Sequence, residues 1–151
     1  MAAILLDTNV LVYAHDSGDP AKRARAIQVL DRLHVTGTGR LTAQCLGEFF
    51  SIVVRARRPL LSSTEAAAQV DLLLQAWPVL DITALVVGEA LRGVRVHCLP
   101  YWDAQLWATG RLNQVPVILS EDFSPGTVLD GIRFVNPFAD DFSLDEWAPL
   151  A

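Results

Sequence analysis

The chain has 151 residues, of which 52% are hydrophobic, so it is long and apolar enough for one folded domain and is not a disordered chain. No apolar run reaches the roughly 18–20 residues that a membrane span requires. The start of the sequence lacks the basic region of a signal peptide. We therefore expect a cytoplasmic protein with no membrane partner. Cys45 and Cys98 match no paired-cysteine motif, and we expect them to be buried free thiols.

The net charge of −5 is concentrated near the carboxyl end of the chain. Residues 1–120 hold 11 basic and 10 acidic side chains, whereas residues 121–151 hold seven acids and one arginine. The acidic average therefore does not exclude nucleic acid as a partner. All the basic residues except Lys22 are arginines, which suit bidentate contacts with phosphate.

The first half of the chain alternates between short apolar strands and longer helices. A strand that ends before Asp7 is followed by the start of a helix, a second, amphipathic helix, a Gly-Thr-Gly turn and another strand. In chain order these elements are expected at residues 3–6, 10–14, 21–33, 37–39 and 40–43. Two more helices follow, of which the first is stopped by Pro59 and the second is capped by Ser62 or Ser63, at residues 44–57 and 62–77.

The second half continues the alternation. Strands are expected at residues 78–82, 116–119 and 132–135, with helices at 83–94 and 102–112. This order predicts an α/β domain with a mainly parallel, five-stranded sheet. The domain is expected to cover residues 1–136. Residues 137–151 are expected to form an acidic tail whose carboxylates are solvated: Asp140, Asp141, Asp145 and Glu146.

Four acidic residues each follow or interrupt an apolar run, where a carboxylate is costly to bury without a partner. They are Asp7, Glu48, Asp103 and Asp122. Asp7 and Asp122 lie just past predicted strands, at the end of a parallel sheet where ligands bind. We expect the fold to bring the four acids into one pocket. Because like charges repel, such a pocket indicates a hard divalent cation, Mg²⁺ or Mn²⁺, and phosphoryl chemistry.

Three of the four acids also have an ordinary explanation. Asp7 is well placed to cap a helix, and Glu48 to be an exposed helix residue. Asp103 would be favoured in the first turn of a helix by the helix dipole. Glu121 is the neighbour of Asp122, and either of the two could be the acid that points inward. The three histidines lack zinc-ligand spacing.

The segments around the four acids resemble the PIN domain, in particular the VapC-like toxins of toxin–antitoxin pairs. The matching segments are residues 6–11, 44–49, 102–104 and 119–123, in the order and at the spacing of that family. The resemblance implies a three-layer α/β/α sandwich with metal-dependent ribonuclease activity. It also implies a homodimer that is inhibited by a small cognate antitoxin protein.

The resemblance further implies a role for each site residue. Asp7 would be the central ligand of Mg²⁺ or Mn²⁺, and Glu48 and Asp103 would complete the acidic cluster. Asp122 is favoured over Glu121 as the fourth acid because the family pattern places it two residues after a hydroxyl residue. That residue is Ser120, and it and Asn9 are candidate supports that orient carboxylates or water. An activated water would cleave RNA to leave a 5′-phosphate and a 3′-hydroxyl, with one metal ion or two.

Other classes are less consistent with the sequence. Haloacid-dehalogenase-like phosphatases need a second aspartate where Asn9 stands, and a lysine well downstream, but none follows Lys22. A P-loop nucleotidase needs a Gly-Lys-Ser/Thr loop, which is missing from the sequence. The remaining alternative is a PIN-like fold that binds RNA or protein without catalysis.

Apolar helix positions indicate further contacts. The helices carry more large apolar side chains than a core of this size requires, so we expect some of them at the surface: Phe49, Phe50, Trp77, Trp102 and Trp107. Part of this apolar surface should be buried in a homodimer, and part should form a groove for the antitoxin. Arginines that follow the Glu48 helix are candidates for gripping phosphates: Arg55, Arg57 and Arg58.

Overall fold

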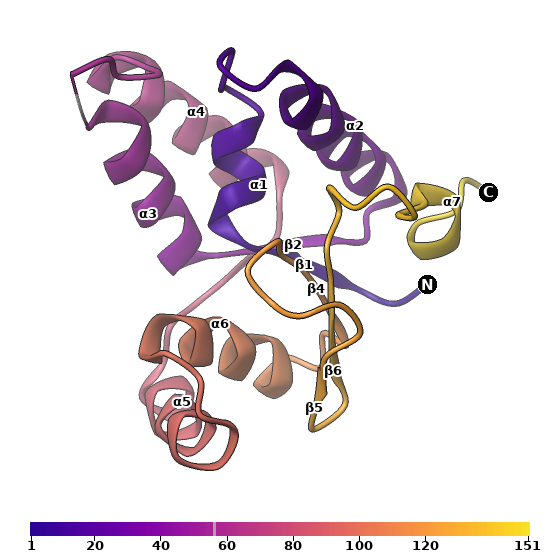
Figure 1. Cartoon of the computed structure of the whole chain (residues 1–151). Helices are drawn as coiled ribbons and strands as arrows, with labels where there is room; N and C mark the ends of the chain where they lie inside the picture. Colours follow the sequence, from indigo (N-terminus) through magenta and orange to yellow (C-terminus); the bar gives the residue numbers. More distant parts are fainter. Residues whose placement is uncertain (56) are drawn as a thin grey trace.

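The computed structural model describes residues 1–55 and 57–151 and contains a six-stranded sheet with the strand order β3-β2-β1-β4-β6-β5 (Figure 1). The strands are β1 (Ile4–Leu6), β2 (Gly39–Thr42), β3 (Val79–Leu80), β4 (Val117–Leu119), β5 (Val128–Leu129) and β6 (Ile132–Val135). All neighbours pair in parallel except β5, which is antiparallel to β6. The prediction of a mainly parallel sheet is confirmed. The sixth strand, β5, was not predicted, because its two residues are too few and too exposed to give an apolar pattern.

Helices cover both faces of the sheet. They are α1 (Thr8–Tyr13), α2 (Pro20–Thr36), α3 (Ala43–Val54), α4 (Ser63–Ala76), α5 (Ala84–His97), α6 (Tyr101–Leu112) and the short α7 (Leu144–Trp147). The chain moves outward from β1 to β3 with α1–α4 on one face, then returns across β1 to β4 with α5 and α6 on the other (Figure 1). Right-handed crossovers in opposite directions place their helices on opposite faces. The predicted three-layer α/β/α sandwich is therefore confirmed.

Side chains that begin the helices explain where they start. Asp7 caps α1, Asp19 precedes Pro20 and caps α2, and Thr42 caps α3 by accepting the Cys45 N–H. Ser62 and Glu65 form a reciprocal capping box at α4. Helix α1 thus begins at Thr8, earlier than the apolar pattern indicated, because Asp7 supplies its cap.

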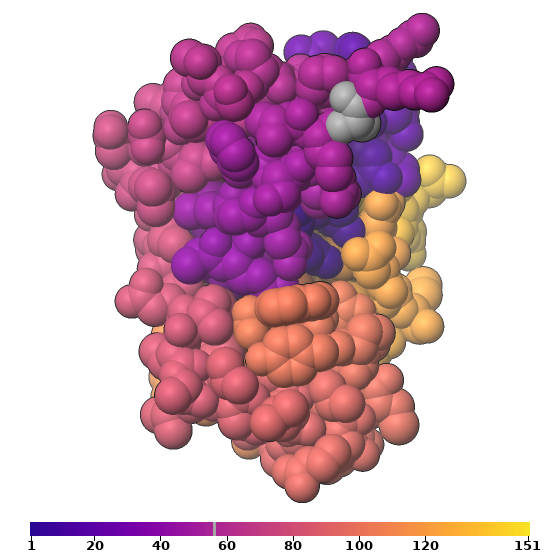
Figure 2. All heavy atoms as spheres, turned by 90° about the vertical axis from the view of Figure 1, so that its left-hand side faces the viewer, coloured from indigo at the N-terminus to yellow at the C-terminus, as the bar shows by residue number. Residues whose placement is uncertain are grey.

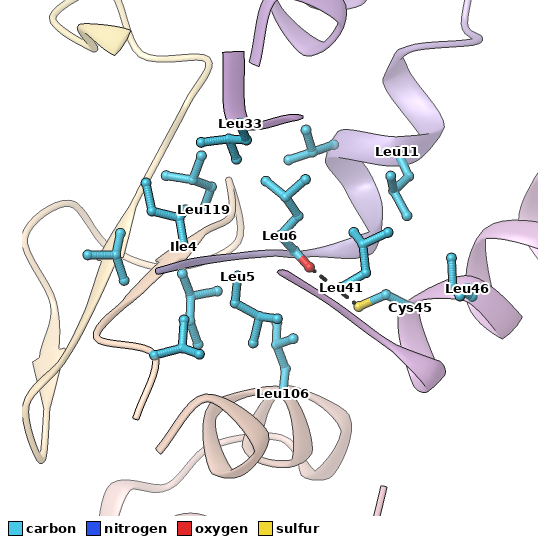
Figure 3. Packing of buried hydrophobic residues seen from close by; sticks show 14 of the residues in the cluster. Ile4, Leu5, Leu6, Leu11, Leu33, Leu41, Cys45, Leu46, Leu106 and Leu119 are labelled. Atoms are coloured by element: carbon cyan, nitrogen blue, oxygen red, sulfur yellow. Dashed lines mark hydrogen bonds between the residues drawn. The ribbon is translucent and has the colours of Figure 1, made fainter. Parts of the chain in front are cut away.

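The core lies on both faces of β1 and β4. Leu5 and Ile118 face α6, where both approach the backbone of Gly110, and Leu106 comes from the same helix. Successive strand residues alternate between faces, so Leu6 and Leu119 point to the side of α1 and α2 (Figure 3). The buried Cys45 thiol donates to the Leu6 carbonyl at 3.6 Å, and burial raises the pKa of that thiol to about 12.

The expectation of two buried thiols is wrong for Cys98, which is exposed. This residue ends α5 in the left-handed conformation, with φ of 56°, at the surface.

Several aromatic side chains that were expected at the surface are buried. Phe49 and Trp107 are fully buried and Trp77 nearly so, whereas Trp102 is 63% exposed. The amphipathic pattern did not distinguish the buried rings because α3 and α6 are each covered on two sides.

The acidic carboxyl-terminal segment folds back onto the domain. Between its exposed acids stand apolar residues that pack against the core: Phe138, Phe142, Leu144, Trp147 and the fully buried Ala148. Arg25 donates to the Pro137 carbonyl at 2.9 Å, and Arg32 pairs with Asp145 at 2.8 Å. The segment therefore covers α2. None of the described helices is both long and apolar enough to span a membrane.

Candidate active site

The candidate site lies where the sheet changes its winding direction. Strand β1 has β2 on one side and β4 on the other, and the chain connects them across opposite faces. Ligands of such sheets bind in the crevice at the carboxyl ends of the strands at this point. Leu6 pairs with Leu119 in the β1–β4 ladder, so Asp7 and Ser120, the next residues, become neighbours.

Asp7 is held at this point by two hydrogen bonds. Its Oδ1 accepts the Thr8 N–H at 2.7 Å and its Oδ2 accepts the Ser120 hydroxyl at 2.6 Å. Asp7 is 9% exposed. Burial, with a smaller contribution from the charges of Asp122 and Asp103, raises the pKa of this carboxyl to about 6, against the two hydrogen bonds, which lower it. The helix-cap explanation of Asp7 is thus correct, but a cap does not account for neighbouring acids that act on it.

Glu48 lies on α3, and hydrogen bonds hold both oxygens of its carboxylate. Its Oε2 accepts the Thr8 hydroxyl and its Oε1 accepts the Gln44 amide, both at 2.7 Å. The Gln44 amide oxygen in turn accepts from Gln105 at 2.8 Å, and the Gln105 oxygen accepts the Tyr101 hydroxyl at 2.9 Å. This chain of donors links α6 to α3 and fixes both oxygens of the carboxylate. Glu48 is therefore turned toward α1 and α6, not toward solvent alone.

Ser120 also positions Asp122. Its hydroxyl oxygen accepts the Asp122 N–H at 3.1 Å while it donates to Asp7, so one hydroxyl bridges the two acids. Asn9 donates its amide to Asp122 Oδ2 at 3.2 Å. Asn9 and Ser120 thus contact the acids that they were expected to support.

Glu121 points to a different set of partners. Its carboxylate accepts the Tyr13 hydroxyl and pairs with Lys22 Nζ, both at 2.7 Å. These contacts fix the segment after β4 against α1 and α2. Asp122, and not Glu121, is therefore the acid in contact with Asn9 and Ser120.

The four acids act on one another although they come from four different parts of the chain. Burial raises the pKa of Asp103, with added contributions from the charges of Asp122 and Glu48. Asp7 responds to the charges of Asp103 and Asp122. The charge of Asp122 thus disfavours ionisation of both Asp7 and Asp103, and Glu48 adds to the effect at Asp103, as is typical of acids that lie near one another.

The donor set suits a hard cation. Within residues 1–55 and 57–151, no three acidic, histidine or cysteine side chains form a ready-made metal cage. Mg²⁺ does not need one, because it keeps several waters and is held through one or two carboxylates. The Asn9 Oδ1 atom is buried without a hydrogen-bond partner, since its amide nitrogen faces Asp122. A hydrated cation would supply a partner for that oxygen and would lower the repulsion among the acids.

The surface around the acids is hollowed. In the space-filling view, atoms of the amino-terminal segment are visible at the bottom of a depression between α3, in purple, and α6, in orange (Figure 2). On the α3 side a groove of about 560 Å³ is lined by Glu48, Arg55 and Trp102, among others. Of the four acids, Glu48 therefore lines an open groove.

Sequence reasoning missed the polar residues that hold Glu48. Gln44 lies one helical turn before Glu48, a spacing at which side chains interact, so it was open to prediction. Thr8 was not among the candidate site residues. Gln105 and Tyr101 come from a distant helix, and only the packing of α6 beside α3 shows their part.

Comparisons with known proteins agree with this geometry. A family model described as the PIN domain matches residues 4–124. No curated protein matches the sequence.

Solved structures show the same fold at low sequence identity. A toxin–antitoxin complex from Klebsiella pneumoniae is 15% identical with a TM-score of 0.65, over 89% of this chain and 98% of that one. VapC20 from Mycobacterium tuberculosis, described as a sarcin–ricin loop cleaving toxin, is 18% identical with a TM-score of 0.63, over 87% and 99%. A DNA-bound VapBC from Salmonella typhimurium is 17% identical with a TM-score of 0.63, over 91% and 99%.

Proposed function

The chain belongs to the PIN-domain family, and we propose that it is a ribonuclease that depends on Mg²⁺ or Mn²⁺. The proposed metal-binding and catalytic residues are four acids: Asp7, Glu48, Asp103 and Asp122. The observation that carries the proposal is the electrostatic coupling of these acids at the winding switch of the sheet. A buried carboxylate with a strongly raised pKa and charged neighbours is typical of a functional site.

The chain's own residues would divide the work. Ser120 and Thr8 hold Asp7, while Gln44 and Thr8 hold both oxygens of Glu48, so the acids present fixed oxygens. Asn9 and Ser120 orient Asp122. A bound Mg²⁺ or Mn²⁺ would neutralise charge on the phosphate and lower the pKa of a water. A carboxylate of the cluster then accepts the proton of the attacking water, as a general base.

The test is cleavage of single-stranded RNA by purified protein. Activity is expected with Mg²⁺ or Mn²⁺, and EDTA should abolish it. Asp7→Ala, Glu48→Ala and Asp103→Ala should each lose nearly all activity, whereas Asp122→Ala should keep part of it. A folded wild-type protein that binds RNA without cleaving it under any of these conditions would support the binding-only alternative instead.

We also propose that the protein is the toxin of a toxin–antitoxin pair. The support is the family and the fold that it shares with VapC toxins. An apolar groove of about 530 Å³ between α3 and α4, lined in part by Leu46, Phe50 and Val70, would take the apolar side chains of an antitoxin segment. A basic side chain of that segment would reach the carboxylates and exclude substrate.

The toxin proposal predicts growth arrest when the chain is expressed alone, and rescue by the small protein encoded beside it. The Asp7→Ala variant is the control and should be harmless. Equal toxicity of wild type and Asp7→Ala would contradict the proposal.

A homodimer is proposed as well, because large apolar side chains on α5 are exposed, among them Leu85 at 78% and Leu91 at 50%. Sedimentation equilibrium tests it.

A further inference from the structure

An exposed tryptophan lies directly beside the acids. Trp102 is the second residue of α6 and immediately precedes Asp103. Its ring packs edge-on against the Tyr101 ring, with the centroids 5.1 Å apart, and its carbonyl accepts the Gln44 amide at 3.3 Å. Even so, 63% of its surface is exposed. The structure thus fixes an indole next to a proposed catalytic carboxylate and leaves most of it in water.

The groove beneath this ring carries opposite charges at its two ends. It runs along α3, where Gln44, Glu48, Ser51 and Arg55 line it, and Trp102 of α6 lines it as well. Glu48 and Arg55 are seven residues apart, which is about 10 Å along a helix axis. Arg55 is exposed and ends the helix. The guanidinium therefore lies away from the acids, on the same side of α3 as the indole.

We propose that this groove binds unpaired RNA next to the cleaved bond, an inference that rests on the proposed ribonuclease function. One base stacks on Trp102, and Arg55 contacts a backbone phosphate. Aromatic stacking and basic side chains are the two means by which proteins hold single strands. Charge complementarity favours this occupant at the Arg55 end of the groove, where the guanidinium attracts a phosphate at a distance from the carboxylates. The apolar groove on the other flank of α3 lacks such a cation among its lining residues.

Binding is measured with a short single-stranded RNA that carries 2-aminopurine, whose fluorescence is quenched by stacking. The Asp7→Asn background is used to prevent cleavage. Trp102→Phe should keep the quenching, whereas Trp102→Ala should lose it and weaken binding about tenfold. Arg55→Ala should weaken binding of all sequences and reduce the slope of affinity against salt by about one. Exposed residues on α2, Val35 and Arg23, provide the matched alanine controls.

Cleavage by the otherwise wild-type protein gives a second readout. Trp102→Ala should raise KM about tenfold and change kcat much less, and Trp102→Phe should restore KM. Unchanged quenching and unchanged KM in a folded Trp102→Ala protein overturn the inference while leaving the ribonuclease proposal intact.

Two further outcomes separate the proposals. If wild type cleaves no RNA but Trp102 still quenches the base, the ribonuclease proposal fails and the binding surface stands. If Trp102→Ala instead dissociates a protein complex in sedimentation and leaves RNA binding unchanged, the groove is a protein interface and the inference is overturned.

Discussion

At the scale of single residues, Asp7 is the side chain whose ionisation the fold resists most clearly. Its folded pKa of about 6 lies above its ordinary value of 3.8, because burial disfavours the charged form. Below pH 4 the group is protonated in both the folded and the unfolded protein and costs nothing. As the pH rises from about 4 to about 6, the unfolded state ionises first, so the free energy of unfolding falls. In metal-free protein the loss is about 3 kcal/mol.

Asp7→Asn removes this titration and should therefore stabilise the metal-free protein at neutral pH. The advantage of the variant over wild type should grow between pH 4 and pH 6 and then level off. Urea unfolding of both proteins in EDTA across this range measures it. If the difference in unfolding free energy between the two proteins is the same at pH 4 and pH 7, the pKa of Asp7 is not raised in the folded protein.

The two adjacent acids after β4, Glu121 and Asp122, should have different roles, one in stability and the other in metal binding. Glu121→Gln removes the charge that pairs with Lys22 and leaves one acceptor oxygen for Tyr13 and Lys22, so it should lower stability by about 1 kcal/mol or less, with Mn²⁺ affinity unchanged. Asp122→Asn should lower Mn²⁺ affinity instead. Calorimetric titration with Mn²⁺ and thermal melting of both variants are the measurements. Loss of affinity in Glu121→Gln alone would reverse the assignment.

Much of the candidate site was predictable from the sequence because strand ends carry their own signal. A carboxylate directly after an apolar strand, as at Asp7 and near Asp122, indicates the functional edge of a parallel sheet. The family pattern favoured Asp122 over Glu121, but the partners of Glu121 needed the structure, because Lys22 and Tyr13 reach it from distant parts of the chain. The Gln105–Gln44 link to Glu48 likewise depends on how two helices pack.

At the scale of elements, α5 and α6 make the most extensive contact between helices of the described chain, and one glycine allows it. A Cβ on Gly93 would lie 2.8 Å from the Trp107 ring, whereas a Cβ on Gly88, in the same helix, would meet nothing within 4 Å. Gly93→Ala should therefore destabilise the protein by about 1–3 kcal/mol through overpacking. Gly88→Ala should stabilise it by about 0.5–1 kcal/mol, since alanine favours the helix.

Chemical unfolding of the two glycine variants provides a matched comparison, because both changes add one methyl group to α5. Destabilisation of equal size at both positions would contradict the described packing of Trp107. The helix itself was predicted from its pattern. The tolerance of each glycine was not, because it depends on the partner helix.

At the scale of the whole molecule, the carboxyl-terminal segment is part of the folded domain, although it was expected to be an acidic tail. Its composition is acidic, yet the apolar residues between the acids pack on the core. Truncation after Asn136 should lower the melting temperature by several degrees, since it exposes α2 and removes the partners of Arg25 and Arg32. Truncation after Ala148 removes three exposed residues and should have little effect. Equal melting temperatures for the two proteins would show that the segment adds no stability.

The central claim is that four acids from separate elements form one site for a divalent cation. Anomalous diffraction from crystals soaked in Mn²⁺ tests it most directly, because it locates the metal itself. The account predicts a peak within coordination reach of Asp7 and at least one of Glu48, Asp103 and Asp122, and loss of that peak in Asp7→Asn crystals. Density for Mn²⁺ elsewhere on the surface, with none beside Asp7, would contradict the claim.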